Sequence, residues 1–307
     1  MFIEQVYKGN NVWWRVLITS ALTTGIFVMN LVVFLFLSKD DMDKTYDIMK
    51  DFSKNVSLFL NLLPFMFFLV LLFFLVHFLH ERTILTLTTA RKKIDFKRIL
   101  FSFSLIVLIS LISFFISFSN NDSGIVWNFN LLNFSIMLII SLVMLPFQIG
   151  FEEYLFRGYL MQQIGFLFKN RWVPLLATSF LFGIFHSANP EVAEMGYGVM
   201  IFYIGTGLLL GVMSLMDDGL ELALGFHFGN NLIAATLVTS EFSALQTHAI
   251  FRYTEVQDSN DILIEMILSI LISYPILLFI LSKKYGWTNW KEKLTGNLSK
   301  NQVNNKF

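Results

Sequence analysis

Residues 131–157 read LLNFSIMLIISLVMLPFQIGFEEYLFR, an apolar run that ends in Glu152, Glu153 and Arg157. The run from Leu131 to Pro146 is apolar enough to belong inside a lipid bilayer. Ionisable side chains at membrane depth are costly, so they persist mostly where they pair, line a watery cavity or carry function. The stretch therefore predicts a membrane helix with a polar site.

The composition is that of a membrane protein. The chain has 307 residues, of which 55% are hydrophobic and 14% charged, and its mean hydropathy is +0.65. A soluble domain carries about 25% charged residues. The net charge of zero gives no electrostatic support to nucleic-acid binding. Because the chain has no cysteine, it has neither disulfides nor thiolate metal sites.

The apolar segments predict an all-α fold, a polytopic membrane helix bundle of about eight transmembrane helices with an active-site cavity inside it. A spanning helix needs about 20 mostly apolar residues. The expected spans are 15–38, 56–79, 99–118, 131–150, 173–188, 199–216, 220–240 and 262–282. We expect the fourth to continue as an amphipathic helix over 151–168. Gly205, Gly207 and Gly211 predict close helix packing.

Charge bias predicts the orientation. The N-terminal sequence lacks a strongly basic start and a clean cleavage site, so we expect its first apolar run to be retained. With the N-terminus cytoplasmic, most of the 22 lysines and arginines fall on the cytoplasmic side, which predicts both termini inside. Loop 39–55 is expected to form a short surface helix. Loop 241–261 is either a lid or a connector, and the polar tail from Lys283 is expected to be mobile.

The two glutamates are expected to differ in surroundings. Glu153 and Arg157 are separated by four residues, so on a helix they pair on one face. Glu152 points about 100° away from Glu153, toward a cavity in this interpretation. The alternative interpretation is a charged helix end at the membrane interface with no chemistry.

Two histidines in apolar segments, His186 and His227, are candidates for chemistry. A single histidine in an apolar segment, such as His186 or His227, is usually a hydrogen-bonded packing residue. His227 and Asn231, however, lie one helical turn apart and project together. An imidazole beside a carboxamide suits an oxyanion or a metal shell. His77 and His80 are interpreted as interfacial, and Asp217, Asp218 and Glu221 as solvated loop charges.

Taken together, the polar groups favour chemistry. They lie in three consecutive intramembrane blocks, and each isolated polar group in lipid would need its own partner. A glutamate can act as general base on water, and a histidine can orient that water or carry a proton. His227 and Asn231 can stabilise a tetrahedral oxyanion.

The same residues resemble a known family. EEYLFR at 152–157 matches the EExxxR motif of the CPBP intramembrane proteases, also called the CAAX prenyl protease 2 or Abi family. FGIFH at 182–186 matches their FxxxH motif, and HFGNN at 227–231 their HxxxN or HxxxD motif. All three occur in order over about 131–240, with no catalytic position missing.

The resemblance implies a helix bundle with a water-filled cavity and endopeptidase activity on peptides that reach the membrane. Glu152 would activate water with His186 as partner, and His227 and Asn231 would hold the oxyanion. Glu153 and Arg157 would be supporting residues.

The same resemblance divides the chain. Residues 1–130 would be variable N-terminal transmembrane helices, 131–240 the catalytic core, and 241–307 the last transmembrane helix with a polar cytoplasmic tail. The partners implied are a peptide or protein substrate at the membrane and the lipid bilayer, with no nucleic acid. The chain fits a prokaryotic plasma membrane better than an organelle.

The cofactor stays open at this point. Glu152, His186, His227 and Asn231 could ligate Zn²⁺ and leave an open position, since zinc accepts nitrogen and oxygen donors. Asn is a poor zinc ligand, which favours the oxyanion role for Asn231. The resemblance does not decide between a metalloendopeptidase and a metal-free glutamate mechanism.

Two other functions compete with proteolysis. The first is a non-enzymatic membrane scaffold, or a bacteriocin self-immunity protein, that uses the same cavity for binding; such a protein should tolerate Glu152→Gln. The second is a proton-coupled transporter, since intramembrane carboxylates and histidines also build proton relays. Neither an inverted repeat nor paired broken helices is visible in the sequence, so the transporter ranks last.

Overall fold

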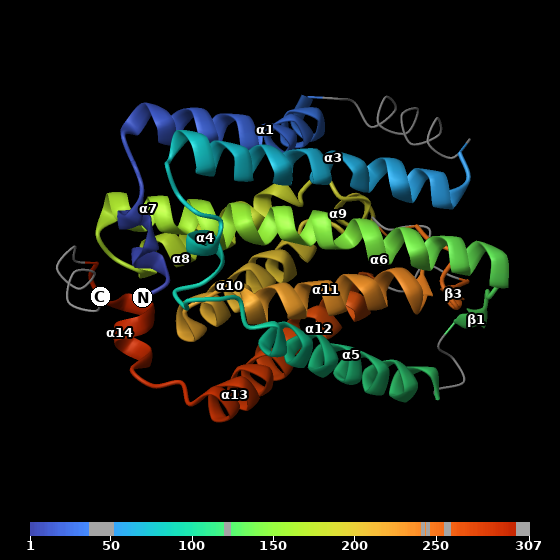
Figure 1. The fold of residues 1–307 in the computed structure, drawn as a ribbon. Helices are drawn as coiled ribbons and strands as arrows, with labels where there is room; N and C mark the ends of the chain where they lie inside the picture. The colour runs from blue at the N-terminus through green and yellow to red at the C-terminus, as the bar shows by residue number, and fades with distance from the viewer. Residues whose placement is uncertain (37–51, 120–123, 241–242, 244–245, 255–258, 299–307) are drawn as a thin grey trace.

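Long apolar helices dominate the computed structural model, which describes residues 1–36, 52–119, 124–240, 243, 246–254 and 259–298 (Figure 1). In chain order the elements are η1 (Ile3–Lys8), α1 (Trp13–Phe36), α3 (Lys54–Phe74), η2 (Leu75–Leu79), α4 (Leu85–Thr88), α5 (Phe96–Phe118), β1 (Ile125–Trp127), α6 (Leu131–Glu153), η3 (Tyr154–Leu160), α7 (Met161–Phe168), α8 (Trp172–Phe185), α9 (Pro190–Met195), α10 (Val199–Asp217), α11 (Glu221–Thr236), β2 (Val238–Thr239), β3 (Phe251–Tyr253), α12 (Ser259–Leu268), η4 (Ser269–Ser273), α13 (Tyr274–Tyr285) and α14 (Trp290–Thr295). Of these, η1 is a 3₁₀-helix and η2, η3 and η4 are π-helices.

The predicted all-α membrane bundle is confirmed. Within the described residues, 6 helices are long and apolar enough to cross a membrane: Trp13–Val32, Lys54–Leu79, Phe96–Phe118, Leu131–Phe168, Val199–Asp217 and Met266–Tyr285. The segments expected at 173–188 and 220–240 are shorter helices, since α8 has 14 residues and α11 has 16. His186 follows the end of α8, and His227 lies on α11.

The helices are arranged in layers around α6. Figure 1 shows α1 and α3 above α6, and α11 and α5 below it. The close contacts follow the same order, because α3 packs on α6, α6 on α11, and α11 on α5, while α8 packs on α10. The two termini lie at one end of the bundle, and strands β1 and β3 lie at the other (Figure 1). The small sheet has the order β1-β3-β2, with β1 antiparallel and β2 parallel to β3.

The helix that begins at Leu131 runs without a break to Phe168, as the sequence predicted. The side chain of Asn130 caps its start by accepting a hydrogen bond from the Asn133 amide at 3.1 Å. Directly after Glu153 the backbone widens into the π-helix η3, which ends at Leu160. Short π-segments inside α-helices occur often at functional sites. Lys169, in the left-handed conformation at φ 57°, ends the helix.

Glycines bring α10 and α11 close to their neighbours. A Cβ added at Gly207 on α10 would lie 2.9 Å from the Ser179 carbonyl oxygen on α8, so only glycine permits this approach. A Cβ at Gly225 on α11 would lie 2.1 Å from the Ile99 carbonyl oxygen on α5. The close packing predicted for α10 is confirmed, and α11 has an equally tight contact.

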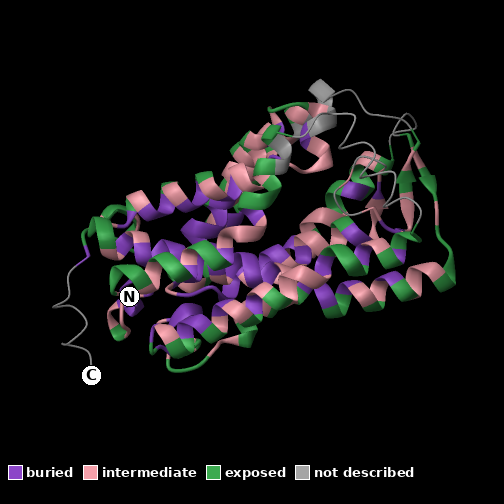
Figure 2. Ribbon diagram, turned by 90° about the horizontal axis from the view of Figure 1, so that it is seen from above, coloured by how far each residue is buried: buried purple, intermediate pink, exposed green. Residues whose placement is uncertain are grey.

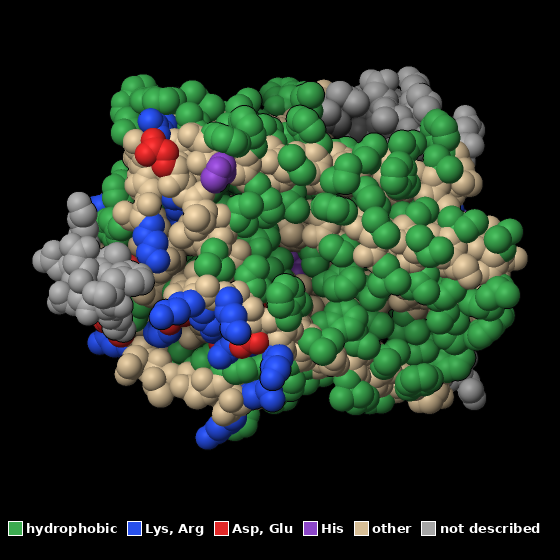
Figure 3. Space-filling view, in the orientation of Figure 1, with side chains coloured by type: hydrophobic (Ala, Val, Ile, Leu, Met, Phe, Trp, Pro, Cys, Tyr) green, Lys and Arg blue, Asp and Glu red, His purple; other side chains and the backbone are tan. Residues whose placement is uncertain are grey.

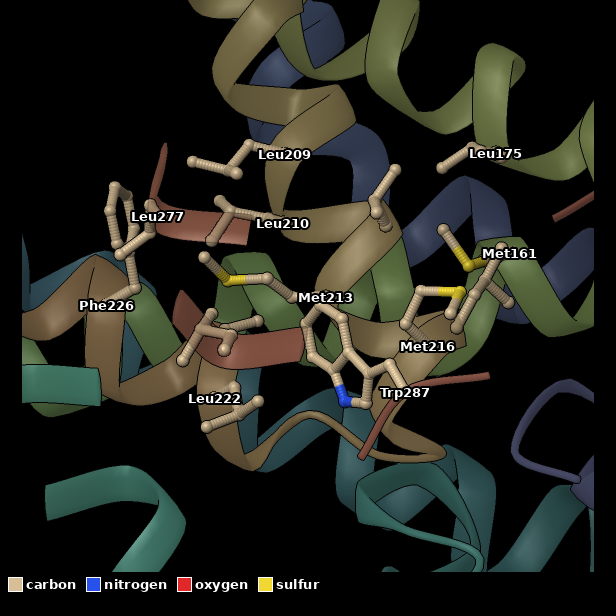
Figure 4. Packing of buried hydrophobic residues seen from close by; sticks show 14 of the residues in the cluster. Met161, Leu175, Leu209, Leu210, Met213, Met216, Leu222, Phe226, Leu277 and Trp287 are labelled. Atoms are coloured by element: carbon tan, nitrogen blue, oxygen red, sulfur yellow. The ribbon is translucent and has the colours of Figure 1, made fainter. Parts of the chain in front are cut away.

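The buried apolar side chains gather around α10. Leu210 and Met213 on α10 pack with Leu222 and Phe226 on α11, and Trp287 covers one end of this cluster (Figure 4). Buried residues lie along the inner faces of the helices and exposed ones along the outer faces (Figure 2). Figure 3 shows that hydrophobic side chains cover most of one outer face, whereas lysines and arginines gather at the end that carries the termini. This distribution is that of a chain surrounded by lipid along its length.

His80, expected at the membrane interface, is buried instead. Its Nδ1 donates to the Asn10 carbonyl oxygen at 2.9 Å, and its Nε2 lies 3.0 Å from both the Thr19 and the Tyr159 hydroxyls. The interpretation failed because these partners are distant in sequence. His77, by contrast, is exposed as expected.

The acidic turn between α10 and α11 is also buried rather than solvated. Asp217 is 4% exposed and Glu221 is fully buried. Arg91 Nη2 lies 2.8 Å from Asp217 Oδ2, Arg91 Nη1 lies 3.1 Å from Glu221 Oε2, and Arg98 pairs with Asp217. Asp218 is half-buried and accepts from the Phe2 amide at 2.9 Å.

The predicted connecting segments are only partly within the described residues. The tail is described as far as residue 298 and includes α14, which packs on α8 and α10, so the expectation of a mobile tail from Lys283 is wrong over the described part. Within loop 241–261, strand β3 pairs with β1 and β2, and whether the loop is a lid or a connector stays a prediction. Most of loop 39–55 lies outside the described residues.

Candidate active site

The site is built on one face of α6, where Gln148 and Glu152 are separated by one helical turn. Gln148 Nε2 donates to Glu152 Oε1 at 2.5 Å. Glu152 is 2% exposed. It lies near the end of α6, the helix that begins at Leu131 beside strand β1. Its second oxygen, Oε2, has no hydrogen-bond partner among the described residues.

Glu153 forms the expected i,i+4 pair with Arg157. Arg157 Nη1 donates to Glu153 Oε1 at 2.9 Å, and both side chains are fully buried. Arg157 Nη2 donates to the Gly207 carbonyl oxygen at 3.1 Å, which ties η3 to α10. The guanidinium also lies over the Phe182 ring, 4.4 Å from its centre.

His227 on α11 contacts both glutamates. Its Nδ1 donates to Glu153 Oε1 at 2.9 Å, and its Nε2 lies 3.6 Å from Glu152 Oε2. The bond to Glu153 fixes the orientation of the ring, because a carboxylate oxygen accepts and the Nδ1 atom must therefore carry the proton. The Nε2 atom is thereby aimed at the free oxygen of Glu152.

Asn231 reaches Glu152 through Gln148. Asn231 Nδ2 donates to Gln148 Oε1 at 3.0 Å. Its own carbonyl oxygen accepts from Asn230 Nδ2 at 3.3 Å. The structure therefore joins α11 to α6 twice, once through His227 and once through Asn231.

His186 lies beside this group. Its Nδ1 donates to the Phe182 carbonyl oxygen at 2.6 Å, so Nε2 is the nitrogen left for other contacts. The imidazole stacks on the Tyr203 ring with 4.5 Å between centres. The Phe182 ring contacts both histidines, with 4.4 Å between its centre and that of His186 and 6.1 Å between its centre and that of His227. Asn189 Nδ2 holds the Tyr203 hydroxyl at 2.9 Å.

The charges in this group nearly cancel. Two buried carboxylates face one buried guanidinium, which leaves a single negative charge in excess. Buried charge is tolerated mainly where it is paired, as the charges of Glu153 and Arg157 are here. The Oε2 atom of Glu152 instead faces His227 Nε2 at 3.6 Å.

Zinc binding by Glu152, His186, His227 and Asn231 remains a prediction. The described residues contain no group of three or more His, Cys, Asp or Glu side chains that could hold a metal ion. His227 directs one ring nitrogen at each glutamate, and the Asn231 amide is engaged with Gln148.

Sequence reasoning missed Gln148 and Tyr203. The signal for Gln148 was its position four residues before Glu152, which places both on one face of α6. Tyr203 had no comparable signal, because its contact with His186 depends on how α10 packs on α8.

The fold and the polar group together define a multi-pass membrane protein with a buried cluster of carboxylate, imidazole and amide groups. Residues 132–233, the segment that carries all three motifs, match the family described as type II CAAX prenyl endopeptidase Rce1-like. The resemblance predicted from the motifs is therefore confirmed for this segment, and the family is one of proteases.

A relative extends the likeness beyond that segment. The chain is 29% identical over 252 residues to the uncharacterized protein YyaK of Bacillus subtilis (strain 168), an alignment that covers 79% of this chain and 83% of that protein. No solved structure matches the chain.

Proposed function

We propose that this protein is an intramembrane endopeptidase in which Glu152 activates a water molecule to hydrolyse peptide bonds. The observation that carries the proposal is Glu152 Oε2, a buried carboxylate oxygen without a hydrogen-bond partner that faces His227 Nε2 at 3.6 Å. Leaving such an oxygen unpaired costs about 1–3 kcal/mol or more, so its retention points to chemistry. The match of residues 132–233 to a protease family supports the same conclusion.

The proposed reaction uses each residue in turn. Glu152 Oε2 takes a proton from water, which His186 Nε2 orients, and the water oxygen attacks the peptide carbonyl carbon. The proton taken from water is passed from Glu152 Oε2 to His227 Nε2, 3.6 Å away, and the resulting imidazolium and the free amide hydrogen of Asn231 stabilise the oxyanion until the proton returns to Glu152. The carbon–nitrogen bond then breaks and Glu152 returns the proton to the leaving amine.

Glu153 and Arg157 act as supporting residues in this proposal. The carboxylate of Glu153 holds the His227 ring by its Nδ1 hydrogen, in the way that a second acid orients a catalytic histidine. Arg157 balances the charge of Glu153 and anchors η3 to α10.

We further propose that the substrates are peptides or proteins that lie in or reach the membrane. The site is built on helices whose outer faces are apolar, so a substrate reaches it from the bilayer or its surface. A prokaryotic plasma membrane with both termini cytoplasmic remains the predicted location. Zinc remains a predicted cofactor, while the mechanism we propose uses Glu152 without a metal.

The test compares wild type with Glu152→Gln after reconstitution in lipid, using a library of internally quenched peptides. Some library members are prenylated at a C-terminal CAAX sequence and others are membrane-inserting but unmodified. Bound zinc is measured on the same samples. We expect cleavage by wild type, none by Glu152→Gln, and less than one zinc per ten chains in the active sample.

The second candidate function is a non-enzymatic scaffold or bacteriocin self-immunity protein. The exposed apolar flanks of α1 and α3 would suit a membrane partner equally well. If wild type cleaves no peptide of the library, or cleaves no faster than Glu152→Gln, the scaffold replaces the protease. Stoichiometric zinc that is needed for cleavage would instead replace the metal-free mechanism by a metalloendopeptidase.

A further inference from the structure

Gln148 lies between two of the residues to which the proposed function assigns chemistry. It accepts from Asn231 Nδ2 at 3.0 Å and donates to Glu152 Oε1 at 2.5 Å. It lies 83 residues from Asn231 in the sequence, so the contact exists only because α6 packs on α11. None of the three sequence motifs includes it.

The direction of this hydrogen-bonded chain is fixed by Glu152. An ionised carboxylate only accepts, so the Gln148 amide must turn its nitrogen toward Glu152. Its oxygen then faces Asn231, which must in turn present its own nitrogen. One carboxylate therefore orders two amides, and the loss of Gln148 would free both the Asn231 amide and the Glu152 carboxylate.

The chain also leaves one oxygen of Glu152 available. Gln148 occupies Oε1, and Oε2 keeps no partner among the described residues. A rotation of the carboxylate that exchanged the two oxygens would break the bond from Gln148. Gln148 thus holds Oε2 toward His227, the side on which the proposed reaction takes place.

We propose that Gln148 is a positioning residue that couples Asn231 to Glu152, an inference that rests on the proposed function. Gln148 touches neither water nor substrate in this mechanism; it sets the orientation of the base and of the oxyanion donor together. Its loss should lower kcat by about 10- to 100-fold, the range of a hydrogen bond to a charged group, with KM changed less than threefold.

The experiment measures kcat and KM on the best-cleaved library peptide for Gln148→Met, Gln148→Glu, Asn231→Leu and the Gln148→Met/Asn231→Leu double variant. Gln148→Met keeps the length of the side chain but removes both hydrogen bonds. Gln148→Glu can still accept from Asn231, yet it cannot donate to Glu152 and adds a like charge beside it, so it should be the less active of the two.

The matched control is Gln163→Met on α7. Gln163 is also a buried glutamine that donates to an asparagine, since its Nε2 lies 2.8 Å from Asn11 Oδ1, but it is not part of the site. Its kcat should remain within twofold of wild type. Melting temperatures of all variants show whether each protein is folded.

The double variant decides the coupling. If Asn231 is positioned through Gln148, the two substitutions are non-additive, and the double variant is at least threefold more active than the product of the single effects predicts. Additive effects, or Gln148→Met with wild-type kcat, overturn the inference. Glu152→Gln in the same assay keeps the two proposals apart: if it still cleaves, the proposed function fails, whereas an inactive Glu152→Gln beside a fully active Gln148→Met rejects Gln148 alone.

Discussion

Two buried ionic clusters lie in the same bundle and differ in how completely their carboxylates are hydrogen-bonded. In the turn cluster, formed by Asp217, Glu221, Arg91, Arg98 and Trp287, every carboxylate oxygen has a partner. Asp217 Oδ1 accepts from Trp287 Nε1 at 3.2 Å as well as from Arg98, and Glu221 Oε1 accepts from the Asp95 amide at 3.3 Å.

The site cluster, formed by Glu152, Glu153, Arg157, His227 and Gln148, is unsaturated. Glu152 Oε2, Glu153 Oε2 and Arg157 Nε have no hydrogen-bond partner among the described residues. Buried polar groups are normally satisfied, so a saturated cluster serves structure, whereas an unsaturated one holds groups ready for a ligand. If the proposed function holds, the turn cluster stabilises the bundle and the site cluster carries the reaction.

The largest effect expected from this comparison is the separation of activity from stability at Glu152. We expect Glu152→Gln to lower kcat/KM by about 10³-fold or more, near the upper range for loss of a general base. The same substitution removes a buried charge with an unpaired oxygen, so the melting temperature should rise or stay the same. A large fall in melting temperature would show that Glu152 supports the fold rather than the reaction.

The opposite result is expected in the turn cluster. Asp217→Ala removes the partner of two arginines and of Trp287, and breaking a buried ion pair costs about 3–5 kcal/mol. We expect a clear drop in the melting temperature in detergent, with kcat per folded molecule within twofold of wild type. Asp95→Ala is the control: it removes a carboxylate that is 38% exposed, pairs with Arg98 and caps α5 through the Lys97 amide, so it should cost only about 1 kcal/mol.

The comparison also shows what sequence could and could not predict. The helix from Leu131 to Phe168 and the Glu153–Arg157 pair follow from local spacing, and both were predicted. The burial of Asp217 and Glu221 was not, because their partner Arg91 lies 126 and 130 residues away and charges in a turn are usually solvated. The hydrogen bond between Gln148 and Asn231 was missed for the same reason, because it forms only when α11 packs on α6.

A smaller effect is expected where the site cluster depends on close helix packing. Gly207→Ala places a Cβ 2.9 Å from the Ser179 carbonyl oxygen and 3.0 Å from its Cα, so α8 and α10 must separate. Overpacking of this kind costs about 1–3 kcal/mol. Because Arg157 binds the Gly207 carbonyl and α8 leads into His186, kcat should fall as well.

The control for that prediction is Gly25→Ala on α1, where an added Cβ meets nothing within 4 Å. Alanine in the interior of a helix is favoured over glycine by about 0.5–1 kcal/mol, so this variant should be slightly more stable and fully active. Equal behaviour of the two alanine variants would mean that the α8–α10 contact does not limit the site.

The smallest effect concerns pH and a third buried group, His80, which belongs to neither cluster. Burial lowers the pKa of His80 below its ordinary value, and the charges of Arg82 and Arg15 act in the same direction. The unfolded chain therefore binds a proton at His80 more readily than the folded protein does. The contribution of His80 to the free energy of unfolding is thus fully present above about pH 6.5, and it decreases as the pH falls below that value. Melting temperatures of wild type should decrease between pH 7.5 and 5.5 by more than those of His80→Gln, while His77→Gln, an exposed neighbour, keeps the wild-type slope. Equal slopes for wild type and His80→Gln would mean that another group carries the pH dependence, and would leave the bond from His80 Nδ1 to the Asn10 carbonyl as a purely structural contact.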